Sequence, residues 1–100
     1  MKVRDIAFSR SGDKGDINNI CVFVYREEDW PRLRDGLTTE VIAAKFGDLV
    51  KGRIDRYEFP NAHGLNFVLH EALGGGGASI SIAPDPQGKS YQSLLQDIDL

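Results

Sequence analysis

Runs of apolar residues along the chain predict a sheet of about four short strands, over residues 3–9, 17–25, 53–59 and 78–83. The second run is continuous from Ile20 to Tyr25 and rich in β-branched and aromatic side chains, which is typical of a central strand. In the last run, Ile80 and Ile82 alternate with serines, as expected of a strand with one face in a core.

Helix signals lie between the second and third strands. Pro31 favours a helix start near residue 29, and Gly36 favours an end, because proline is tolerated in the first turn and glycine follows the last one. Thr38 or Thr39 can cap a second helical segment directly afterwards.

Residues 62–73 predict a further helix, which Asn61 can cap. At about 100° per residue its apolar side chains share one side, and they are Leu65, Val68, Leu69 and Ala72. Apolar residues in the tail, 91–100, indicate a final short helix or an edge strand. The chain therefore predicts an α/β (α+β) two-layer sandwich, with about four strands and two main helices on one face.

The predicted central strand is apolar on both sides. One side carries Ile20, Val22 and Val24, and the other carries Cys21, Phe23 and Tyr25. Helices on one face of a sheet cover only one of these sides, so something else must cover the second. The tail is one candidate and a partner subunit is another. We favour association, either as a homo-oligomer or in a complex with another protein.

Length and charge narrow the classes of function. One hundred residues form a single domain, 1–100. No apolar run approaches the roughly 20 residues of a membrane span, and a formal net charge of -3 disfavours nucleic acid as a partner. Cys21 is the only cysteine, so no internal disulfide forms. Because the first residues lack the apolar segment of a signal peptide, we expect a cytoplasmic protein.

A polar loop is predicted between the first two strands. Its glycines could turn backbone N–H groups toward a phosphate or carboxylate, with Lys14 adding a positive charge. Asp13 and Asp16 could instead face a hard cation, and an ordinary hairpin turn explains the same composition. The candidate ligand or interface residues in this region are Arg10, Ser11, Gly12, Asp13, Lys14, Gly15, Asp16 and Asn19.

The polar side of the predicted 62–73 helix carries His63, Asn66 and His70, which fall in one row. A solvated helix face normally carries Lys, Glu or Gln, so this row indicates contact with a ligand or partner. Alternatively, one histidine acts as a general acid or base, or both are ordinary surface side chains. The two histidines lie about 10 Å apart along a helix, so we expect no metal site. Asn61 and Gly75, in a run of glycines open to ligand approach, complete the candidate set.

Several motifs follow one another along the chain. They are Arg10-Ser11-Gly12-Asp13-Lys14-Gly15-Asp16 with Asn19-Ile20, Arg56-Tyr57-Glu58, Pro60-Asn61-Ala62-His63, Leu65-Asn66-Phe67-Val68-Leu69, Ala72-Leu73-Gly74-Gly75-Gly76, and Asp85 with Gly88-Lys89. Together they resemble the AtuA-like domain, which occurs at the C-terminal end of acyclic terpene utilisation AtuA proteins and as a separate small protein. The resemblance implies a ferredoxin-like α/β fold and a link to bacterial catabolism of branched terpenoid or related acids, carried as CoA thioesters. It implies no defined reaction.

Three functional hypotheses follow. The first is an accessory or binding domain that pairs with a larger AtuA-type protein or with itself, and contributes the 10–16 loop and the histidine row to a shared site or interface. The second is a small enzyme in which Asp13 or His63 is a general base and Lys14 holds an anionic acyl substrate. The third is a homodimer in which both groups only pack. We expect no cofactor and no metal.

Overall fold

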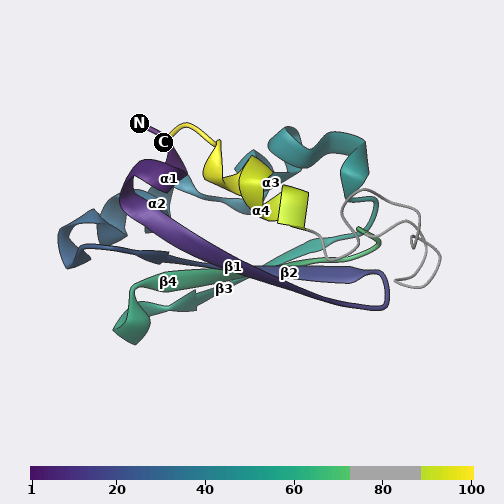
Figure 1. The fold of residues 1–100 in the computed structure, drawn as a ribbon, viewed down its shortest axis with the longest axis horizontal. Helices are drawn as coiled ribbons and strands as arrows, with labels where there is room; N and C mark the ends of the chain where they lie inside the picture. Colours follow the sequence, from purple (N-terminus) through teal and green to yellow (C-terminus); the bar gives the residue numbers. More distant parts are fainter. Residues whose placement is uncertain (73–88) are drawn as a thin grey trace.

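The computed structural model describes residues 1–72 and 89–100, which form two layers (Figure 1). One layer is an antiparallel sheet in the order β1-β2-β4-β3, and the other consists of helices on one face of that sheet. The strands are β1 (Ala7–Lys14), β2 (Ile17–Val24), β3 (Ile54–Phe59) and β4 (Gly64–Leu69). The predicted α+β sandwich is confirmed. Gly75 and the strand predicted over residues 78–83 lie outside the described residues.

Four helices of the described residues make up the second layer. They are α1 (Val3–Ile6), α2 (Trp30–Gly36), α3 (Thr39–Phe46) and α4 (Lys89–Gln96), with 3-10 turns at Glu27–Asp29, Gly47–Leu49 and Pro60–Ala62. The predicted helices after Pro31 and Thr38 are confirmed, and the Thr38 hydroxyl accepts the Val41 N–H at 3.2 Å as an N-cap. None of these helices is long and apolar enough to cross a membrane.

The N-terminal part of the sheet differs from the prediction. The first residues form α1 rather than a strand, because the Asp5 carboxylate accepts the Lys2 backbone N–H at 2.8 Å and closes a helical turn. The strand that follows continues to Lys14, through most of the predicted loop. Gly15 then adopts a φ of 62°, which lets a two-residue turn reverse the chain into β2.

The helix predicted over residues 62–73 is wrong, because this segment contains β4. Leu65, Phe67 and Leu69 are fully buried, whereas Asn66 and Val68 between them are partly exposed. The same short apolar run fits a helical and a strand period. The strand prevails because β4 lies between β2 and β3 and satisfies its backbone hydrogen bonds on both edges.

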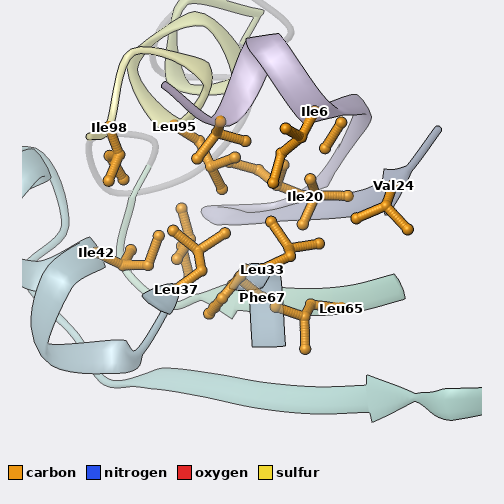
Figure 2. Close-up of a cluster of buried hydrophobic side chains, with 14 of the residues drawn as sticks. Ile6, Ile20, Val24, Leu33, Leu37, Ile42, Leu65, Phe67, Leu95 and Ile98 are labelled. Carbon is orange, nitrogen blue, oxygen red and sulfur yellow. The ribbon is translucent and has the colours of Figure 1, made fainter. Parts of the chain in front are cut away.

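The core lies between the sheet and the helices (Figure 2). Ile20 of β2 and Phe67 of β4 are fully buried, as are Leu33 of α2 and Ile42 of α3. Leu95 of α4 is buried in the same core. The tail therefore docks as a short helix, one of the two forms expected for it, but it packs on the face that the other helices already cover.

Side-chain amides hold α4 against β1. Gln92 Nε2 donates to the Ser9 carbonyl at 2.8 Å, and its Oε1 accepts from the Ser11 hydroxyl at 3.1 Å. Gln96 Nε2 donates to the Ser9 hydroxyl at 2.7 Å. Because these bonds satisfy the polar groups that β1 turns toward the helices, the helix side of the sheet is closed by residues of the same chain.

The two ends of the chain lie side by side on the helix side of the sheet (Figure 1). Val3 N–H donates to the Ile98 carbonyl at 2.9 Å, and Leu100 N–H donates to the Met1 carbonyl at 2.8 Å. Backbone hydrogen bonds therefore fasten the C-terminal residues directly to the N-terminal ones.

An ion-pair cluster around Asp97 reinforces this junction. Its carboxylate lies 3.0 Å from Lys45 Nζ, 3.2 Å from Lys2 Nζ and 3.3 Å from Arg4 Nη1. Hydrogen bonds from Lys45 and Lys2, together with the charges of these lysines, hold the pKa of Asp97 below its usual value. The cluster joins α4 to both α1 and α3.

Candidate binding face

One face of the sheet carries no described helix, and we name it the open face. The strand register places its side chains in three rows that cross β1, β2, β4 and β3 in turn. These rows are Phe8, Phe23, Gly64 and Phe59; Arg10, Cys21, Asn66 and Tyr57; and Gly12, Asn19, Val68 and Asp55. Because side chains alternate along a strand, the residues between them point toward the helix layer.

Aromatic rings gather at one end of the open face. The Phe8 ring centroid lies 5.7 Å from that of Phe23 and 5.4 Å from that of Tyr25. The Phe23 ring lies against Gly64, where a Cβ atom would overlap it. The aromatic side chains of this face that stay 40% to 64% exposed are Phe8, Tyr25, Tyr57 and Phe59. Soluble monomers rarely leave such a cluster open, so this end indicates a contact surface.

A polar centre lies beside the aromatic end. Asn19 Nδ2 donates to Asn66 Oδ1 at 2.6 Å, and Cys21 Sγ lies 3.4 Å from the same oxygen. Burial raises the pKa of the Cys21 thiol, against smaller opposing effects of the Asn19 hydrogen bond and the Arg10 charge. Cys21 is therefore a neutral thiol near pH 7 rather than an activated nucleophile, and the neighbouring Arg10 supplies an exposed positive charge.

A histidine–carboxylate pair lies at the β3 edge of the open face. His70 Nε2 donates to Asp55 Oδ2 at 2.8 Å, and Arg53 Nε donates to the same carboxylate at 3.2 Å. A carboxylate only accepts, so this bond keeps a proton on His70 Nε2. The bond from His70, followed by that from Arg53, lowers the pKa of Asp55. The open face thus has an anionic group at its β3 edge and Arg10 at its β1 edge.

The comparisons with known proteins place the chain in a family. The family model of the AtuA ferredoxin-like domain matches residues 1–100. The chain belongs to the AtuA ferredoxin-like domain family. The resemblance seen in the sequence and the ferredoxin-like α+β fold that it implied are both confirmed. The comparisons with curated proteins and with solved structures found no match.

The AtuA ferredoxin-like domain distributes the loop candidates over both faces of β1. Asp13 and Lys14 are exposed, and Ser11 bonds to Gln92 of α4 on the helix side. The open face carries Arg10, Gly12 and Lys14, together with Asn19 of β2. The helix side carries Ser11 and Asp13, and the turn contains Gly15 and Asp16. The seven residues of the loop therefore do not surround one point.

A cavity of about 480 Å³ lies close to this turn. Asp16, Asp48 and Glu71 line it together with Lys51. Three carboxylates against one ammonium group disfavour an anionic ligand in this cavity. In the described part of the domain, no three His, Cys, Asp or Glu side chains are grouped closely enough to hold a metal ion.

His63 lies at the opposite end of the sheet from Asp13 and Lys14. The His63 carbonyl accepts the Val24 N–H at 3.2 Å, whereas Asp13 pairs with Asn18. Six residues along β2 separate these two points, a distance of about 20 Å at about 3.3 Å per residue. The AtuA ferredoxin-like domain therefore does not bring His63 to Lys14, whereas the alternative base, Asp13, is adjacent to Lys14 in β1 but on the opposite face of the strand.

The predicted row of His63, Asn66 and His70 depended on a helix that does not form. Asn66 and His70 lie on the open face, on and just after β4. His63 instead adopts a left-handed φ of 53° before β4, and its ring centroid lies 6.1 Å from that of Trp30. Asn61 is exposed in the 3-10 turn next to it.

Of the exposed aromatic residues of the open face, sequence reasoning placed Tyr25 there and missed Phe8, Tyr57 and Phe59. The one signal available was the second strand, whose apolar residues on both sides predicted an uncovered face. These three residues come from β1 and β3, which are the two edge strands in the order β1-β2-β4-β3. That order is needed to place them on one face, because β1 and β3 are distant in sequence.

Proposed function

We propose that this domain is an accessory subunit that works by association through its open face. In this proposal it serves a larger AtuA-type protein in the catabolism of acyclic terpenoid or related branched acids, carried as CoA thioesters. The observation that carries the proposal is the open face itself, where aromatic side chains lie beside a hydrogen-bonding centre and no described element covers the sheet (Figure 1).

The chemistry of the open face suits a broad protein contact. Small ligands usually bind in concave sites, whereas this face is one side of a four-stranded sheet. Exposed aromatic and arginine side chains are the types enriched at protein interfaces. Arg10, Asn19 and Asn66 would supply polar contacts in the centre of such an interface, and Arg10 would attract an anionic ligand shared with the partner.

The enzyme alternative receives no support from the geometry. A general base must lie within hydrogen-bond reach of the proton that it removes. His63 lies at the other end of the sheet from Lys14, and Asp13, the alternative base, projects from the opposite face of β1 to Lys14. We place the accessory function in the cytoplasm, because the single cysteine is a free thiol, as expected in a reducing compartment.

Genetic complementation in the native host tests the proposed function. Deletion of the gene is expected to impair growth on an acyclic terpenoid acid and to leave growth on succinate unchanged. The wild-type gene should restore growth, and the Phe8→Glu variant should not, because a carboxylate would enter the aromatic end of the open face. The readout is growth rate on each carbon source.

The matched control is Leu49→Glu, which places the same charge on an exposed apolar residue away from the open face and should restore growth. Co-expression with the AtuA-type protein of the same genome gives a second readout, in which the wild-type domain co-purifies with it. Normal growth of the deletion strain on the terpenoid acid would contradict the proposal, as would full rescue by Phe8→Glu.

A further inference from the structure

We infer that the partner on the open face is a second copy of this chain, in a face-to-face homodimer. This inference rests on the proposed association through the open face and names its occupant.

The open face is large enough for a stable dimer. Four strands about 4.8 Å apart and up to 8 residues long span roughly 20 by 25 Å, side chains included. The accessible surface of projecting side chains exceeds this flat area, so the face approaches the roughly 800 Å² per partner of a standard interface. Its aromatic side chains are already exposed, and no rearrangement is needed to present them.

The rows of the open face are complementary to themselves. A two-fold axis parallel to the strands, between β2 and β4, exchanges β1 with β3 and sets each row over its own counterpart. Phe8 then faces Phe59 of the partner subunit, and Cys21 faces Asn66 of the partner subunit. The aromatic end of one subunit therefore packs against the aromatic end of the other, and the two polar centres face each other.

The charges of the open face favour the same arrangement. Arg10 at the β1 edge comes to lie over Tyr57 of the partner subunit, whose ring face attracts a guanidinium. Asp55 of the partner subunit lies in the next row, two residues from Tyr57 along β3, so a carboxylate lies within reach of the same arginine. The like charges Lys14 and Arg53 lie at the end of the face, where they stay in the solvated rim.

The mass of the protein in solution tests this inference. We expect the wild-type chain to elute as a particle of twice its 11.1 kDa mass in size-exclusion chromatography with light scattering. Phe8→Glu and, independently, Tyr57→Lys should weaken the dimer by about 100-fold or more, because the first buries an unpaired charge and the second sets a lysine against Arg10 of the partner subunit. Leu49→Glu should remain dimeric, and circular dichroism identifies any variant that fails to fold.

The accessibility of Cys21 gives a second test of the homodimer. In the proposed dimer its Cα lies about 11 Å from that of the partner subunit's Cys21, since sheets stack about 10 Å apart and β2 lies one strand from β4. Because the thiol then lies between two packed sheets, it should react with a maleimide at least about 10-fold more slowly in the wild type than in the monomeric Phe8→Glu variant. Cys21→Ser shows that the reaction is at this thiol, and equal rates in the wild type and Phe8→Glu would contradict the homodimer.

The outcomes separate this inference from the proposed function. A wild-type monomer at high concentration overturns the homodimer, and so does a dimer that survives both Phe8→Glu and Tyr57→Lys. A monomer whose co-purification with the AtuA-type protein is lost in Phe8→Glu also overturns the homodimer, but it supports association through the open face. A dimer whose gene is dispensable on terpenoid acids keeps the inference and contradicts only the proposed metabolic role.

Discussion

Asn18 is a buried side chain whose two amide atoms have no hydrogen-bond partner among the residues that the structure describes. It lies on the helix side of β2, two positions before Ile20 in the core. Leaving a buried polar group unsatisfied costs free energy that an apolar side chain would not. The neighbouring Asn19, by contrast, lies on the open face, and its amide donates a hydrogen bond to Asn66.

Replacement of Asn18 by valine is expected to stabilise the domain. Asn18→Val removes both unsatisfied atoms and adds a β-branched side chain to a central strand, so the free energy of unfolding should rise by about 1–2 kcal/mol. Asn19→Val is the control, and its loss of a hydrogen bond should lower stability by about 1 kcal/mol. Urea unfolding of both variants gives the comparison. A lower midpoint for Asn18→Val would show that the amide has a partner.

At the scale of elements, the contact between β2 and β4 depends on Gly64. The Phe23 ring crosses the place where a side chain of Gly64 would stand, and the Val22 carbonyl lies 3.0 Å from that position. A side chain here would force the two central strands apart or push the ring away. Gly64 thus allows an aromatic residue of β2 to lie flat across β4.

Gly64→Ala is therefore expected to destabilise the domain, by about 1–3 kcal/mol, the usual range for overpacking. Gly12→Ala on the same face is the control. Its Cβ would lie 3.4 Å from Asn19 Oδ1, so it should be nearly neutral. Phe23→Leu should recover part of the loss when combined with Gly64→Ala. Thermal unfolding of the variants decides between these outcomes, and equal melting temperatures for the two alanine variants would refute the overlap at Gly64.

The elements that the sequence predicts correctly are those with a local cause. The caps and breakers Pro31, Gly36 and Thr38 place α2 and α3, and a continuous apolar run places β2. β4 was mistaken for a helix because its identity depends on two neighbouring strands distant in sequence. The same holds for the candidate site. The apolar pattern of β2 alone predicts an uncovered face, whereas locating its aromatic end requires the order of the four described strands.

At the scale of the whole molecule, Asp97 makes folding sensitive to acid. Its pKa in the folded chain lies below the unfolded value of about 3.9, so the ion pairs stabilise the fold above that value. This stability is lost as pH falls through the lower folded pKa, when Asp97 becomes protonated. The lowered pKa of Asp55 acts with the same sign.

Asp97→Asn should reduce the melting temperature near pH 7 and make its decline toward about pH 3 less steep than in the wild type. Asp99→Asn is the matched control, because the Asp99 side chain is 78% exposed and its carboxylate lies 3.6 Å from Lys2 Nζ. It should leave both the melting temperature and its pH profile nearly unchanged. Parallel profiles for wild type and Asp97→Asn would show that this cluster does not contribute to acid sensitivity.

The junction of the two chain ends has a consequence for how this domain can be attached to other proteins. Both ends leave the molecule from one point on the helix side, and the open face lies on the other side of the sheet. A tether at either end, or insertion into a host loop through both, would leave the aromatic end accessible. The two chain ends and the open face therefore lie on opposite sides of the sheet, so a protein attached at either end would not have to cover that face (Figure 1).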